Sequence, residues 1–273
     1  MSPNASHNID DSETLLVSLQ NNLGIVVPDD QRNNVLERIA PVLSMFKLDS
    51  LSSLAKSLEN GESEEIKAVV LGIVSKTQLS WRLNGEIKHV LNDYIFSQLS
   101  DYARIWVVGC GQGQSAYAVA MEAAEYEHNH DGLKNIEFCA TDISATEINQ
   151  AKLGIYNKQQ VSGLSEEYKK LFTTLGKKAG EIQVKEKIRQ KVKFSECDLT
   201  VDFQVLGKMD LIICPEALAY FSNDIKASIL QQCSNLLKSG GILLTGSSQI
   251  FMPIEANLER VDHSAGVFYR RKD

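Results

Sequence analysis

The stretch RIWVVGCGQG, residues 104–113, joins a short apolar run to a glycine-rich turn, and the helix-forming sequence SAYAVAMEAAEYE follows it. An apolar run of this length that ends in glycines and opens a helix is typical of the first strand, turn and helix of a parallel α/β sheet. Because glycine tolerates positive φ and has no side chain, such a turn also lets the backbone approach a ligand closely. The stretch therefore predicts both a fold class and the place of a binding site.

Four more apolar runs follow this first one. They are IEFCATDI (136–143), VKFSECDL (192–199), DLIICPEAL (210–218) and GGILLTGSS (240–248), and helical patterns separate most of them. Buried strands that alternate with helices predict a mainly parallel sheet of the α/β class. The ending, LERVDHSAGVFYRR, predicts an antiparallel hairpin at the edge of the sheet.

Residues 11–73 show only helical patterning. Val35, Ile39, Val42, Leu43 and Phe46 follow the spacing of one buried helix face, and a second short helix runs from Ser50 to the capping pair Asn60-Gly61. We expect four short helices here. The predicted organisation is a helical domain at 11–80, a linker helix at 81–100 and an α/β domain at 101–273, with an inserted subdomain at about 164–193.

The composition excludes several classes of protein. With 43% hydrophobic and 23% charged residues, the 273-residue chain is expected to be soluble and globular, and its net charge of −7 argues against a nucleic-acid binder. It has no apolar run of ~18 residues and no signal-peptide pattern at its start. Its five cysteines lack any CxxC pair, so we expect reduced thiols and a cytoplasmic location. His128 and His130 have no further cluster of ligands beside them, so we expect a surface loop there and no metal site.

Acidic residues at two predicted strand ends refine the ligand. The loop reads GxGxG, and Gln114 stands where a dinucleotide fingerprint requires glycine. This pattern suits the looser loop of enzymes that bind S-adenosylmethionine. Asp142 can accept hydrogen bonds from ribose hydroxyls, and Asp198 from an adenine amino group. Either aspartate alone could be a helix N-cap, but the glycine loop and both carboxylates together favour an adenosine site.

Several segments resemble one known family over nearly the whole chain, the CheR chemotaxis-receptor glutamate O-methyltransferases. Trp81-Arg82 stands for the family's aromatic-Arg motif, and Tyr117–Met121 for its Tyr-Ser-Ile-Ala-Met helix. The remaining matches are Thr141-Asp142-Ile143-Ser144 running on to Leu153-Gly154-Ile155-Tyr156, the stretch Gly180–Asp198 for the family's small β-subdomain and the strand after it, the stretch Cys214–Phe221, and the ending Gly266–Arg271. The resemblance implies a small helical domain followed by a Rossmann-like methyltransferase domain with an inserted β-subdomain.

The resemblance also implies an activity, a cofactor and a set of site residues. The activity is methyl-ester formation on receptor glutamates, with S-adenosyl-L-methionine as cofactor, S-adenosyl-L-homocysteine as product and receptor helices as the partner. Arg82 would orient the acceptor carboxylate. Tyr220 would bond near the transferred methyl group, although a half-buried packing tyrosine is an equal alternative. The implied cofactor contacts are Gly109, Gly111, Gly113, Gln114, Asp142, Ile143, Asp198, Leu199, Glu216, Lys76 and Gln78.

Some of these positions differ from the family's usual residues. Lys76 and Gln78 stand where members usually carry Asn and Thr, and Asp198 and Glu216 stand where they carry Asn. An alternative is therefore a CheR-like module that binds S-adenosylmethionine, S-adenosylhomocysteine or a signalling partner without turnover. Another is methylation of a different carboxylate or of a small molecule. Basic residues recur at every second position from Lys185 to Lys193. If extended, they would form one cationic face, which we interpret as solvated rather than as a dock for acidic helices.

Overall fold

The computed structural model describes residues 9–61, 63–74, 81, 83, 85–100, 102–130, 135–214, 218, 220–245 and 257–272. They fall into two compact units. The first unit consists of Met1–Lys76 and Leu218–Lys226, and the second of Thr77–Ala217 and Ala227–Asp273. The helical unit is therefore completed by a segment from late in the chain, which the contiguous division at residue 80 did not foresee.

The first unit is helical, as its sequence predicts. Its helices are α1 (Ile9–Leu23), the 3₁₀ turn η1 (Asp29–Gln31), α2 (Arg32–Met45), α3 (Leu51–Glu59) and α4 (Glu64–Val74). In α2 the predicted face is buried at Val35, Ile39 and Val42. Ser50 caps α3 by accepting a hydrogen bond from the Ser53 N–H.

The late segment joins this unit through the main chain. Ile25 and Phe221 form an isolated antiparallel bridge. The Val26 N–H donates to the Tyr220 carbonyl at 2.7 Å, and the Ser222 N–H donates to the Gly24 carbonyl at 2.6 Å. These bonds make residues 220–222 part of the helical unit.

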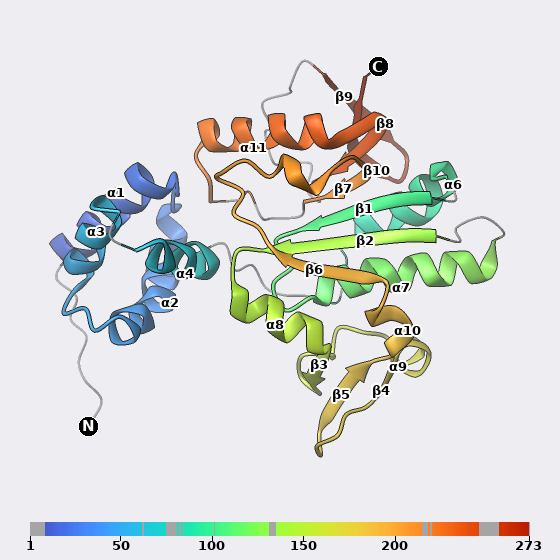
Figure 1. Ribbon diagram of the computed structural model, residues 1–273, viewed down its shortest axis with the longest axis horizontal. Helices are drawn as coiled ribbons and strands as arrows, with labels where there is room; N and C mark the ends of the chain where they lie inside the picture. The colour runs from blue at the N-terminus through green and yellow to red at the C-terminus, as the bar shows by residue number, and fades with distance from the viewer. Residues whose placement is uncertain are drawn as a thin grey trace. The chain divides into compact units, whose positions relative to one another are not determined.

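A seven-stranded sheet forms the centre of the second unit (Figure 1). Its order is β6-β2-β1-β7-β8-β10-β9, in which β10 runs antiparallel to both its neighbours and the other pairs are parallel. The predicted hairpin is β9–β10, at one edge. The strands are β1 (Tyr102–Val108), β2 (Asn135–Asp142), β6 (Val192–Glu196), β7 (Met209–Ile213), β8 (Leu237–Leu244), β9 (Leu258–His263) and β10 (Gly266–Arg271).

The strand order reverses at β1. From β1 the chain moves outward through β2 to β6, and then returns to β7 on the other side of β1. In open α/β sheets, ligands bind outside the carboxyl ends of the strands at such a reversal. The fold therefore places a site at the loop that follows Val108.

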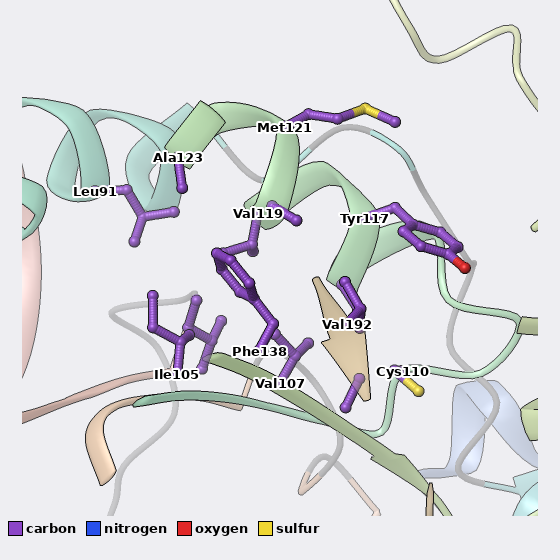
Figure 2. Packing of buried hydrophobic residues seen from close by; sticks show 14 of the residues in the cluster. Leu91, Ile105, Val107, Cys110, Tyr117, Val119, Met121, Ala123, Phe138 and Val192 are labelled. Atoms are coloured by element: carbon purple, nitrogen blue, oxygen red, sulfur yellow. The ribbon is translucent and has the colours of Figure 1, made fainter. Parts of the chain in front are cut away.

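Helices cover both faces of this sheet. They are α7 (Gln114–Asn129), α8 (Ala145–Leu153) and α11 (Asn223–Leu236), and α7 and α11 lie on opposite sides in Figure 1. Under α7, the core contains Ile105 and Val107 of β1, and Figure 2 shows Phe138 pointing from the sheet toward Val119. Trp106 belongs to the opposite face, where its ring lies 5.3 Å from that of Phe203. This alternation is the period-two pattern of a strand buried on both sides.

The region expected to be a linker helix, 81–100, is instead part of the core of the second unit. It forms α5 (Gly85–Val90), the π-helical turn η2 (Leu91–Ile95) and α6 (Phe96–Gln98). Leu91 and Ile95 are fully buried in the same cluster as the α7 face, and α5 contacts β10. Among the described residues, no helix has both the length and the apolar character that a membrane crossing requires.

A small antiparallel sheet interrupts the path from α8 to β6. Its order is β3-β5-β4, and it is accompanied by two short helices. The elements are β3 (Ile155–Asn157), α9 (Glu166–Phe172), β4 (Thr173–Leu175), β5 (Glu181–Val184) and α10 (Glu186–Arg189). The inserted sheet thus begins at Ile155, before the expected residue 164. Figure 1 shows β4 and β5 extending away from the main sheet.

Helix α10 also breaks the basic run that follows β5. Lys185 lies before this helix, and its ammonium donates to the Lys170 and Leu171 carbonyls. Lys191 pairs with Glu127 at 3.1 Å and Lys193 with Glu137 at 3.2 Å. The run is therefore not one extended cationic face, because its residues belong to different elements and two of them have acidic partners.

Candidate functional site

The loop after β1 requires its glycines. Gly109, Gly111 and Gly113 have φ values of 64°, 51° and 92°, a region that residues with a Cβ rarely adopt. At Gly113 space is also short, because a Cβ would lie 3.0 Å from the Ala151 Cβ and 3.1 Å from the Phe194 Cζ. The loop is thus tightly turned and free of side chains at three of its five positions.

Asp142, at the end of β2, fastens this loop. One of its carboxylate oxygens accepts a hydrogen bond from the Gly111 N–H at 2.8 Å. The other accepts one from the Ser144 N–H at 3.0 Å. The N-cap of α8 is Ser144, whose hydroxyl accepts from Glu147, so Asp142 is not the cap. Its carboxylate instead lies between the glycine loop and the end of the neighbouring strand.

The end of β6 joins the same place. The Cys197 N–H donates to the Asp142 carbonyl at 3.0 Å. Asp198 follows directly, and one of its carboxylate oxygens accepts from both the N–H and the hydroxyl of Thr200, at 2.8 and 2.6 Å. One carboxylate oxygen of Asp198 therefore stabilises the turn that begins at this residue.

The structure brings eight of the predicted cofactor residues to one edge of the sheet. Four follow β1, two stand at the end of β2 and two follow β6. They are Gly109, Gly111, Gly113, Gln114, Asp142, Ile143, Asp198 and Leu199. Their convergence follows from the parallel pairing of β1, β2 and β6, which places all three carboxyl ends together.

Gln114 offers a direct test of whether a cofactor fits. It is only 2% exposed, and its Oε1 atom has no hydrogen-bond partner among the described residues. A buried acceptor without a donor is costly, and a ligand that supplies a donor would remove this cost. S-adenosylmethionine carries an ammonium group and two ribose hydroxyls as donors. The amide oxygen of Gln114, the carboxylate of Asp142 and the side-chain-free loop suit such a ligand.

The cysteines near this edge are unreactive. Burial, with a smaller contribution from the Asp142 charge, raises the pKa of the Cys110 thiol well above its usual value. Burial and the Asp198 charge raise the pKa of Cys197 to about 11. Both thiols are therefore protonated at neutral pH and poor nucleophiles. Within the described residues, no three His, Cys, Asp or Glu side chains are grouped so as to hold a metal ion.

The other predicted residues do not all have a described place. Arg82, Lys76, Gln78 and Glu216 lie outside the described residues. Tyr220 is half-buried and belongs to the helical unit, where its carbonyl accepts the hydrogen bond from Val26.

Trp81, the neighbour of Arg82 in sequence, is described and 4% exposed. Its ring stacks on Tyr117 at 6.5 Å between centroids and meets the edge of Tyr156 at 4.9 Å. The position before Arg82 is thus anchored in an aromatic cluster of the second unit, which we call the Trp81 cluster and which consists of Trp81, Tyr117 and Tyr156.

Sequence reasoning missed one set of contacts at the glycine loop. The Tyr156 hydroxyl donates to the Gln112 carbonyl at 2.6 Å, and the Gln160 amide donates to the Gln112 Oε1 at 2.9 Å. The only signal in the sequence was the motif Leu153-Gly154-Ile155-Tyr156, and it gave no indication of which residues it contacts.

Comparison with known proteins identifies the family. The family model described as "CheR methyltransferase, SAM binding domain" matches residues 82–267. A chemotaxis protein methyltransferase of Vibrio anguillarum is 30% identical over 93% of this chain and 94% of its own length. Chemotaxis protein methyltransferase 1 of Vibrio cholerae has the same identity and the same coverage.

A more distant likeness is found among solved structures. A TehB-like SAM-dependent methyltransferase from Corynebacterium glutamicum is 13% identical, with a TM-score of 0.42 over 70% of this chain and 89% of that one. The family match covers more than half of the chain, and the Vibrio relatives align over nearly all of it. The chain therefore belongs to the CheR methyltransferase family.

Proposed function

We propose that this protein transfers the methyl group of S-adenosylmethionine to glutamate side chains of chemotaxis receptors, forming methyl esters. The family match and the chemotaxis methyltransferases among its relatives support this activity. The observation that carries the cofactor assignment is the Asp142 carboxylate, which bonds to the Gly111 N–H across the end of the sheet. The receptor as partner and the cytoplasm as location are part of the same proposal.

The chain's own residues would hold the cofactor as follows. Asp142 would accept hydrogen bonds from the ribose hydroxyls, since a carboxylate has about four acceptor positions. Asp198 would accept one from the adenine amino group, and the Gln114 oxygen, which is buried, would accept one from an ammonium donor. Ile143 and Leu199, which follow the two aspartates, supply apolar contact. By resemblance to the family, Lys76, Gln78 and Glu216 complete the contacts. The bound cofactor supplies a methyl group that is already activated by its sulfonium centre.

The acceptor side requires no general base. A glutamate side chain is ionised at pH 7 and already carries the lone pair that attacks. The protein's task is to align this carboxylate and to remove part of its water. Arg82 is suited to the alignment because a guanidinium group matches a carboxylate with two parallel hydrogen bonds. Tyr220 is the second candidate, as a donor near the acceptor.

An assay of methyl-ester formation tests the proposal. The full chain is incubated with S-adenosylmethionine tritiated in its methyl group and with receptor-bearing membranes, and the membranes are then treated with alkali. Methyl esters release volatile tritiated methanol, whereas methylated amines retain their label. Base-labile label on the receptor supports the proposal. Label that resists alkali contradicts carboxylate methylation, and cofactor binding without any label identifies a module without turnover.

A further inference from the structure

The glycine loop is held in place by the inserted sheet as well as by the strand that carries it. Gln112 lies between Gly111 and Gly113, both of which have positive φ. Glycine restricts the rotation of its backbone only weakly. The position of a residue between two glycines therefore depends on the contacts that this residue itself makes. Among the described residues, Tyr156 and Gln160 donate hydrogen bonds from their side chains to Gln112.

The first contact is made by a buried hydroxyl. Tyr156 lies in β3, is 2% exposed, and donates to the Gln112 carbonyl at 2.6 Å. Its ring is fixed by the edge-on contact with Trp81, and Trp81 in turn stacks on Tyr117. Burial raises the pKa of the Tyr156 hydroxyl far above its usual value, so the group is a donor at neutral pH.

The second contact is made by an oriented amide. Gln160 donates from Nε2 to the Gln112 Oε1 at 2.9 Å. The Oε1 of Gln160 accepts from the Asn157 N–H at 2.9 Å, and the Gln160 N–H donates to the Asn157 Oδ1 at 2.8 Å. This reciprocal pair fixes the orientation of the Gln160 amide, so that its NH₂ group points to the loop.

We infer that Tyr156 and Gln160 are positioning residues for the cofactor: they hold Gln112, and through it the glycine loop, in the conformation that binds S-adenosylmethionine. The inference rests on the proposed cofactor site. It gives the inserted sheet a role in cofactor affinity, because β3 is paired to β5 in the register Tyr156 with Ile182. The same tyrosine contacts Trp81, so one side chain supports both the cofactor loop and the residue next to Arg82.

The test compares substitutions of two tyrosines whose hydroxyls donate hydrogen bonds to different acceptors. Tyr156→Phe removes the bond to the loop and keeps the ring in the Trp81 cluster. Tyr117→Phe is the matched control, since Tyr117 is also fully buried in this cluster but donates to the Ala151 carbonyl, in α8, at 2.8 Å. We expect Tyr156→Phe to raise the Kd for S-adenosylmethionine about tenfold, the usual effect of one buried hydrogen bond. Tyr117→Phe leaves this Kd unchanged.

Two further readouts separate positioning from general stability. In the methyl-ester assay, Tyr156→Phe raises the KM for S-adenosylmethionine while kcat at saturation stays near that of the wild type. Hydrogen exchange of the Gly113 amide, which donates to the Cys110 carbonyl at 2.9 Å, becomes faster in Tyr156→Phe and not in Tyr117→Phe. Equal Kd values for both variants and the wild type, with equal losses of thermal stability, overturn the inference. An equal rise in Kd for both variants also overturns it.

A second pair of variants covers the case in which Tyr156→Phe fails to fold. Gln160→Leu changes a half-buried residue and removes the two side-chain bonds of Gln160, to the Gln112 Oε1 and from the Asn157 N–H, while the Gln160 N–H keeps its bond to the Asn157 Oδ1. Gln183→Leu is its control, because the Gln183 amide donates to the Leu153 carbonyl, away from the loop. A rise in Kd for Gln160→Leu alone supports the inference, and unchanged Kd values in both overturn it. If the wild type itself fails to bind S-adenosylmethionine in calorimetry, the proposed function fails instead.

Discussion

Asp142 and Gly111 are joined by a hydrogen bond of 2.8 Å from the glycine N–H to the aspartate carboxylate. The two residues lie 31 positions apart, on the loop after β1 and at the end of β2. This bond connects the carboxyl ends of β1 and β2 at the point where the strand order reverses. Because the Asp142 carboxylate accepts a hydrogen bond from the loop, its position is fixed before a ligand binds.

Replacing this carboxylate should weaken cofactor binding strongly. Asp142→Ala removes the acceptor for Gly111 and the proposed acceptor for the ribose, so we expect the Kd for S-adenosylmethionine to rise at least about 100-fold, or ~3 kcal/mol. Asp210→Ala is the control, because Asp210 also accepts a main-chain hydrogen bond, from Arg104, but at the start of β7. Calorimetry measures both. Normal affinity in Asp142→Ala rejects the ribose assignment.

Arg82→Ala should separate binding from turnover. If Arg82 only aligns the acceptor carboxylate, its loss removes an ion-paired contact of about 2–3 kcal/mol and lowers methyl transfer about 30-fold to 100-fold or more. The Kd for S-adenosylmethionine stays within about twofold of the wild-type value. The tritium assay measures the rate of methyl transfer, and calorimetry on the same preparation measures the Kd for S-adenosylmethionine. Unchanged turnover removes Arg82 from the mechanism.

Gly113→Ala should destabilise the fold more than an alanine at an open turn. The new Cβ lies about 3 Å from Ala151 and Phe194, and the alanine must also adopt a φ of 92°. We expect a loss of roughly 2–4 kcal/mol in the free energy of unfolding, from strain and overpacking together. Gly180→Ala shares the positive φ, at 83°, but has nothing within 4 Å of its Cβ. Urea unfolding of the two variants isolates the packing contribution, and equal losses contradict it.

The buried thiols predict a fall in stability at alkaline pH. Burial raises the pKa of Cys214 from 9.0 to about 12. Below pH 9 the thiol is neutral in both states, and its contribution to stability is fully present. Between pH 9 and 12 it ionises in the unfolded chain only, so the free energy of unfolding falls by up to about 1.4 kcal/mol per pH unit.

Cys214→Ala checks the direction of this change. The variant should lose less stability than the wild type when the pH is raised from about 8 to about 10, because the unfolded variant has one thiol fewer to ionise. Urea unfolding at the two values of pH gives both differences. Equal losses in the two proteins show that Cys214 does not contribute to the alkaline fall.

The sequence was most informative where the pattern is local. The GxGxG spacing and the apolar runs sufficed to predict the parallel sheet and the glycine turn, because strand burial and positive φ are decided by neighbouring residues. The role of 81–100 was missed, since a helix that connects domains and a helix that packs in a core can have the same periodicity. Leu91 and Ile95 are apolar in either case, and only their tertiary partners distinguish the two.

Hydrogen bonds between residues far apart in the sequence could not be predicted either, because they too depend on tertiary partners. Tyr156 and Gln112 lie 44 residues apart, and Gly24 and Ser222 almost 200. Nothing in their local sequences favours one partner over another. The start of the inserted sheet at Ile155 was missed because a three-residue strand is too short to show a period of two.

The return of residues 220–222 to the helical unit limits how this protein can be dissected. A fragment that stops at residue 76 leaves the carbonyl of Gly24 and the N–H of Val26 without the partners they have in the full chain, and uncovers Ile25, which is 1% exposed. A truncation series from either end therefore cannot yield an intact helical unit. An autonomous version calls for residues 218–226 to be grafted onto it through an added linker, or for a circular permutation that makes the two pieces contiguous.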